Sequence, residues 1–160
     1  MKSLLEFMEV HACIDELFEK HRDRVVELRF AAALEALEAF EHELLRHMQD
    51  EEEVILPLYE ARVGAVPGGS PELFRLEHRN LVRNLATIKQ ALQALVADPS
   101  AGPREAHRFL AKGHLFFQLL EHHSQREKNI LYPRLDAALS EEERQMILRN
   151  CGLCQGRALS

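Results

Sequence analysis

Apolar residues recur at helical spacing in four long blocks of the chain, and this pattern predicts an all-α fold. The blocks cover about residues 3–27, 30–62, 71–97 and 103–139. Segments rich in proline and glycine, at 66–71 and 98–103, break the pattern on either side of the third block. Ser70 is expected to cap that helix, with Pro71 in its first turn.

Four long helices joined by short turns predict an up-down-up-down four-helix bundle. The spacing of Ser140 and Glu143 is typical of a capping box and predicts a short C-terminal fifth helix. We therefore expect a bundle domain over residues 1–139, and a short helix with a Cys-x2-Cys tail over 140–160. One such cysteine pair, Cys151 and Cys154, is a weak metal signal without a second pair.

Polar residues interrupt the apolar stripes at repeated positions. A histidine and a glutamate four residues apart project to one side of a helix. This pair occurs twice, 76 residues apart, and each copy lies the same distance before a proline. The two copies are His47, Glu51 and Pro57, and His123, Glu127 and Pro133.

The other two blocks each carry a lone histidine, His11 and His78, inside the apolar stripe. Each half of the chain is then a helix with one histidine followed by a helix with His-x3-Glu, which gives the bundle an approximate two-fold axis. A single histidine on an apolar face is usually a core residue. Four imidazoles and two carboxylates in one core are costly to bury unless something pairs them, and a metal centre would do so.

The angular position of a residue around its helix predicts whether it faces the site or the surface. His123 shares its face with apolar neighbours and His122 does not, so His123 is expected to face the site. We expect the surface or an interface for His42, His107 and His114, and a helix end for His21. Asp15, four residues after His11, points toward the site as an acceptor for His11 or as a direct ligand.

Composition narrows the class of protein. A net charge of −6 with no basic stripe argues against nucleic acid as a partner. No apolar run is long enough for a membrane helix, and the N-terminus lacks the features of a signal peptide, so we expect a cytoplasmic protein. Three cysteines, an odd number, favour free thiols.

The expected ligands are four imidazoles and two carboxylates. Zinc prefers four ligands, often with thiolate, and magnesium or calcium prefers oxygen alone. Six nitrogen and oxygen ligands that can share two carboxylate bridges suit a pair of iron ions, with manganese as the alternative.

The segments that carry these residues resemble the hemerythrin-like, HHE cation-binding family: MEVHACIDELF, LLRHMQDEEEVILPLYE, LEHRNL and LLEHHSQREKNILYP. The resemblance implies a non-haem diiron centre with an oxo or hydroxo bridge. It places His11 and His47 on one iron and His78 and His123 on the other, with Glu51 and Glu127 bridging the two.

The chain departs from the oxygen-carrying hemerythrins at two positions. Those proteins have a second histidine four residues after the third-helix histidine, where this chain has Val82, and His-x4-Asp where this chain has His-x3-Glu. An open position on the His78 iron follows, unless another group fills it. The expected function is to bind or sense oxygen, nitric oxide or iron. The alternative is a diiron oxidoreductase, peroxidase-like or nitric-oxide-consuming, and the sequence names no redox or protein partner.

Overall fold

The computed structural model describes residues 3–151, and these residues form helices and connecting turns with no strand among them. The all-α prediction is confirmed. In chain order the elements are η1 (Leu4–Phe7), α1 (Met8–Val26), α2 (Phe30–Asp50), η2 (Glu51–Ile55), α3 (Leu56–Arg62), α4 (Pro71–Ala97), α5 (Pro103–Arg126), η3 (Glu127–Leu131), α6 (Tyr132–Ala138) and α7 (Glu141–Asn150).

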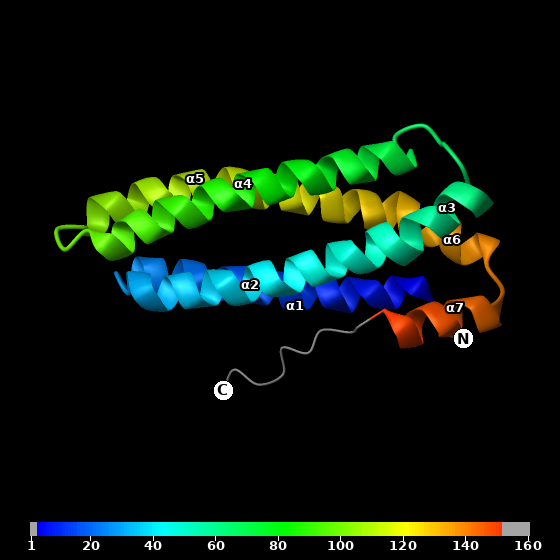
Figure 1. The fold of residues 1–160 in the computed structure, drawn as a ribbon, viewed down its shortest axis with the longest axis horizontal. Coiled ribbons are helices and arrows are strands. Elements are labelled where there is room, and N and C mark those ends of the chain that lie inside the picture. Colours follow the sequence, from blue (N-terminus) through cyan, green and yellow to red (C-terminus); the bar gives the residue numbers. More distant parts are fainter. Residues whose placement is uncertain (1–2, 152–160) are drawn as a thin grey trace.

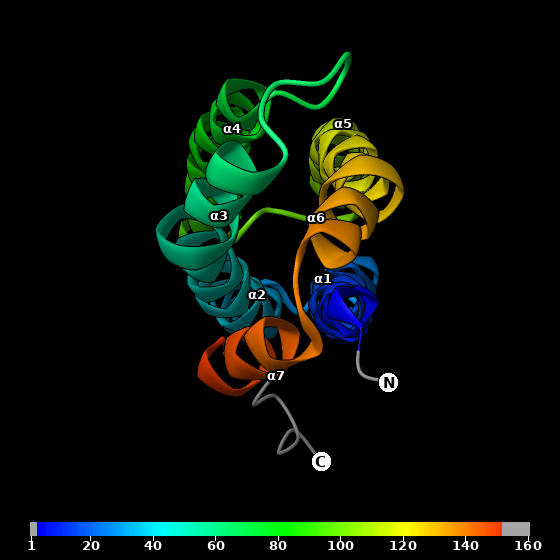
Figure 2. The same cartoon turned by 90° about the vertical axis from the view of Figure 1, so that its right-hand side faces the viewer.

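Four rods lie side by side and run along the long axis of the molecule (Figure 1). The first rod is α1 and the third is α4. The second rod is α2 continued through η2 into α3, and the fourth is α5 continued through η3 into α6. Contacts join α1 to α2, α2 to α4, α4 to α5 and α5 back to α1, so the rods enclose a common interior. Figure 2 shows this arrangement from the end, with α7 across the outside of the α1–α2 side.

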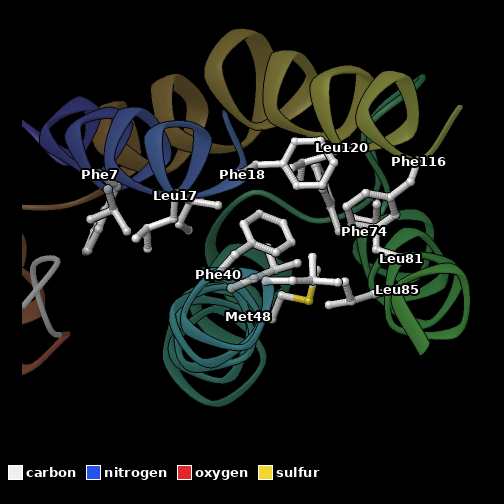
Figure 3. Packing of buried hydrophobic residues seen from close by; sticks show 14 of the residues in the cluster. Phe7, Leu17, Phe18, Phe40, Met48, Phe74, Leu81, Leu85, Phe116 and Leu120 are labelled. Atoms are coloured by element: carbon white, nitrogen blue, oxygen red, sulfur yellow. The ribbon is translucent and has the colours of Figure 1, made fainter. Parts of the chain in front are cut away.

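Aromatic and aliphatic side chains fill the interior between the rods (Figure 3). The ring of Phe18 on α1 lies 5.0 Å from Phe40 on α2 and 5.6 Å from Phe116 on α5, measured between centroids. These buried rings pack α1, α2 and α5 against one another in this layer.

The predicted caps are present. The Ser70 side chain accepts a hydrogen bond from the backbone N–H of Leu73 at 3.3 Å, and Pro71 is the first residue of α4. Ser140 and Glu143 form the reciprocal capping box at the start of α7. None of the helices in the described part of the chain is both long and apolar enough to cross a membrane.

Two turns of π-helix, η2 and η3, interrupt the second and fourth rods. The backbone N–H of Leu56 donates to the carbonyl of Glu51, five residues earlier, and that of Tyr132 donates to Glu127 in the same way. A proline follows directly in each case and has no N–H, and its ring would clash with a carbonyl four residues back in a regular helix. The wider turn relieves that clash.

The expectation of free thiols is wrong for Cys13, which is disulfide-bonded. Cys151 is a buried free thiol after α7. Cys154, the other half of the Cys-x2-Cys tail, lies outside the described residues, as do residues 152–160 as a whole.

Candidate metal centre

Six side chains from the four rods meet at the centre of the interior, and each of them is at most 7% exposed. They form two groups in which one ligand atom from each residue lies within 4.8 Å of all the others. The groups overlap because both contain Glu51 and Glu127. The first is His11, His47, Glu51 and Glu127, and the second is Glu51, His78, His123 and Glu127.

The ligand atoms are spaced as neighbours in a coordination shell. His11 Nε2 lies 2.9 Å from His47 Nε2 and 3.0 Å from Glu127 Oε2. Glu51 Oε2 lies 3.2 Å from His78 Nε2. Two atoms that are each ~2.1 Å from one ion, at a right angle, are ~3.0 Å apart. The side chains need no large movement to share an ion.

Several of these buried atoms make no hydrogen bond among the described residues, although they lie close to one another. They are Glu51 Oε2, His78 Nε2 and both carboxylate oxygens of Glu127. The neighbouring imidazole nitrogens are within ion-pair distance of these oxygens, for example His123 Nε2 at 2.6 Å from Glu127 Oε1, but no hydrogen bond joins them within residues 3–151. Buried polar atoms without a partner carry a desolvation penalty that a cation bound between them would remove.

The outer nitrogen of three imidazoles faces an oxygen from another helix. Such contacts fix the tautomer and turn Nε2 toward the interior as the free ligand atom. The Nδ1–oxygen distances are 2.6 Å for His11 with Ser124, 2.7 Å for His78 with Glu52, and 2.8 Å for His123 with Glu77. Arg126 Nε donates to the second oxygen of Glu77 at 2.9 Å and holds that carboxylate in place.

Tyr132, the first residue of α6, donates a hydrogen bond from its phenol to Glu51 Oε1. Its ring is fully buried and stacks on Phe7 with 5.6 Å between centroids. Burial and the nearby Glu51 carboxylate raise the pKa of Tyr132 well above its usual value. The phenol therefore stays protonated as a donor to this glutamate.

The electrostatics of the site balance burial against opposite charge. Burial lowers the pKa of the buried His47 imidazole, and the Glu51 charge only partly opposes this. At His78 burial acts in the same direction, but the nearby carboxylates of Glu127 and Glu51 outweigh it and raise the pKa to about 10. In the absence of metal, imidazolium and carboxylate thus compensate each other's charge.

The structure separates the histidines much as register predicted. His123 is buried in the site and its neighbour His122 is exposed, as are His42, His107 and His114. His21 differs from expectation, because it is completely buried near the end of α1. Its Nδ1 lies 2.5 Å from the Phe18 carbonyl, and its ring packs on the Phe18 and Phe109 rings.

Asp15 lies outside both ligand groups. Ser124, not Asp15, lies at His11 Nδ1, so the acceptor role expected for Asp15 belongs to Ser124. Asp15 does border a small cavity beside the site, together with His11 and Glu127. Val82 is 43% exposed and borders a surface groove that also reaches His78.

Sequence reasoning missed Ser124, Glu52, Glu77 and Tyr132. In the sequence Glu52 looks like part of a solvent-exposed acidic run with Glu51. Its contact with His78 becomes visible only when α4 is placed beside η2. The first three share one signal that could have found them, since each is polar and directly adjoins an expected ligand in the sequence. Tyr132 carries no such signal.

Comparisons of the chain with protein-family models, with curated proteins and with solved structures found no match.

Proposed function

We propose that this chain is a hemerythrin-like protein, an up-down-up-down four-helix bundle that holds two non-haem iron ions and binds or senses oxygen, nitric oxide or iron. One observation carries the proposal: two buried ligand groups share two glutamates, and most oxygens of these glutamates receive no hydrogen bond from the part of the chain that the structure describes. A structural core would satisfy those oxygens with donors, or would not contain them.

The donor set supports iron. His11 and His47 would hold one ion and His78 and His123 the other, with both glutamates reaching the two ions. The two groups contain only imidazole and carboxylate, and six such ligands suit iron or manganese better than zinc or calcium. Bound iron would supply a redox-active Lewis acid to which a small molecule can bind.

The cavity beside the site limits the size of that molecule. It has room for about one water-sized molecule. Apolar side chains form much of its wall, with Ile14 from α1, Leu44 and Met48 from α2, and Leu120 from α5. A small uncharged molecule such as oxygen or nitric oxide fits these walls. Larger organic substrates do not.

The same cavity favours the second candidate, a diiron oxidoreductase that consumes nitric oxide or hydrogen peroxide, because these molecules are equally small. Turnover separates the two functions. A binding or sensing protein takes up about one small molecule per site and stops. An oxidoreductase consumes many equivalents when a reductant is supplied.

Metal analysis and an optical spectrum of the purified protein test the proposal. We expect two irons per chain, and loss of most of both in Glu51→Ala and in Glu127→Ala, because each carboxylate serves both ions. His123→Ala should also lose iron. His122→Ala, which removes the exposed neighbouring imidazole, is the matched control and should keep both ions.

Circular dichroism of each variant shows whether the helices persist, so that loss of iron is not mistaken for unfolding. Glu127→Gln keeps the volume of the side chain and removes its charge, and it should still lose iron. Wild-type protein without iron or manganese would overturn the proposal. Iron lost from His122→Ala but retained by His123→Ala would overturn the assignment of ligands.

A further inference from the structure

Asp15 lies at the mouth of the cavity that leads to the ligand cluster. It follows His11 by one turn of α1 and is exposed, whereas Glu127 is 1% exposed, yet both border the same small cavity. Ser124 on α5 borders it as well. The cavity therefore connects the surface between α1 and α5 with the buried carboxylate.

The Asp15 carboxylate is unpaired within the described part of the chain. Within residues 3–151 it accepts no hydrogen bond and forms no ion pair, and it belongs to neither ligand group. The contact it could have made with His11 Nδ1 is made by Ser124 at 2.6 Å. A carboxylate in this position is available to an ion that arrives from solution.

The surroundings of Asp15 are acidic. Burial and the charges of Glu121 and Glu19 raise its pKa, and among these neighbours only the His11 imidazole opposes the rise. Both glutamates are exposed, although Glu19 is also paired with Arg22 at 3.2 Å. Like charges that converge on a cleft concentrate cations there and raise their rate of association.

The inner end of the cavity provides an independent observation. Neither oxygen of Glu127 accepts a hydrogen bond from the described residues, and this buried side chain borders the cavity. His11, whose Nε2 lies 3.0 Å from Glu127, borders it too. An unpartnered carboxylate at the mouth is thus followed by a buried carboxylate and an imidazole.

We propose that Asp15 is the residue that captures Fe²⁺ on its way into the site. The ion binds the Asp15 carboxylate at the mouth and then passes to Glu127 and His11, and Asp15 is not a ligand of the final centre. This inference rests on the proposed function. A second hollow, the surface groove beside His78, is not bordered by Asp15, His11 or Glu127.

The test measures iron uptake and release in wild type and in Asp15→Asn, which removes the charge and keeps the shape. Release from the loaded protein is followed with an excess of a ferrous chelator, and uptake after that removal with Fe²⁺ alone. We expect both rates to fall roughly tenfold, because an entrance is also the exit. Saturation should remain at two irons, and uptake by wild type should slow more steeply with added salt.

Asp23→Asn is the matched control, because it makes the same change at an exposed position of the same helix, and both rates should stay at the wild-type values. Asp15→Glu should restore most of the rate. Unchanged rates in Asp15→Asn would overturn the inference and leave the proposed function intact. Fewer than two irons at saturation would make Asp15 a resident ligand, which also overturns it. Wild type that binds no iron would refute both proposals.

Discussion

Three of the inward-facing imidazoles depend on a polar residue that adjoins a different ligand in the sequence. Glu52 follows Glu51 but contacts His78, and Glu77 precedes His78 but contacts an imidazole on α5. Ser124 continues the pattern from α5 to His11 on α1. The pattern stops at α1, where the residues on either side of His11 are apolar. Three of the four rods therefore orient an imidazole on a neighbouring rod as well as supplying ligand side chains of their own.

His21 makes the stability of the fold sensitive to acid. Burial lowers its pKa from 6.5 to about 4 in the folded protein. Between these two pH values the unfolded chain binds a proton at His21 and the folded chain does not. The contribution of neutral, buried His21 to the free energy of unfolding is therefore fully present above pH 6.5 and is lost as the pH falls toward 4. Relative to His21→Phe, wild type should lose about 2 kcal/mol of unfolding free energy between pH 7 and pH 5.

Urea unfolding of both proteins at the two pH values measures this difference. The ligand cluster is common to both proteins, so its contribution cancels in the comparison. Equal acid sensitivity of wild type and His21→Phe would mean that His21 does not control it.

At the scale of helices, sequence predicted more than it missed. The boundaries of α4 and α7 follow from local chemistry, because Ser70 and Ser140 cap their own helices without help from the rest of the chain. The π turns were not predicted. Proline at position 57 or 133 shows that the helical ladder must change, but the choice between a break and a wider turn depends on packing against neighbouring rods.

The turn between α1 and α2 contains a strained residue. Leu28 has φ of 60°, in the left-handed region, and follows a helix end in which Arg29 N–H bonds to Arg24 O at 2.9 Å and Leu28 N–H to Val25 O at 3.0 Å. Glycine usually occupies this position in such a helix end. Leucine pays a steric penalty there, and glycine does not.

Leu28→Gly should therefore raise the unfolding free energy by about 1 kcal/mol, less what is lost from the partly buried side chain. Chemical denaturation measures the change. Leu5→Gly is a useful comparison, since Leu5 is similarly exposed at 44% but lies in a right-handed turn, and it should destabilise the protein. A decrease in stability for Leu28→Gly would contradict this account.

At the scale of the whole molecule, the site contains side chains from all four rods, so an ion bound there would link the rods to one another. Removal of the proposed iron would leave buried carboxylate oxygens without partners, so the metal-free protein should melt at a lower temperature. A ligand at 100 times its dissociation constant adds ~2.7 kcal/mol of stability. For a domain of this size, that corresponds to roughly 5–10 °C. Calorimetry before and after chelation measures it, and an unchanged melting temperature with iron shown to be absent would favour a purely structural cluster.

The arrangement of the centre was only partly accessible from sequence. Helical periodicity was enough to predict that His11, His47, His78 and His123 lie on inward faces. The apolar stripe of a helix repeats with every turn, and its position does not depend on how the neighbouring helices are placed. The contacts around them were not accessible, because they join residues on different rods. The Glu52–His78 contact, for example, depends on the height of α4 relative to η2, which no local pattern encodes.

The internal repeat extends to the backbone. The elements η2 and α3, over residues 51–62, and η3 and α6, over 127–138, have the same lengths and are related by the same shift of 76 residues as the His-x3-Glu pairs. The two halves of the chain thus present their glutamates from equivalent wide turns.

One side chain breaks this equivalence. The repeat partner of Tyr132 is Leu56, so Glu51 receives a phenol hydrogen bond and Glu127 does not. A hydrogen bond to a carboxylate draws charge from it and makes it a poorer electron donor. The two carboxylates are therefore unequal as ligands. Ions held between them would experience an asymmetric electrostatic field, although the backbone turns that carry the two glutamates are equivalent.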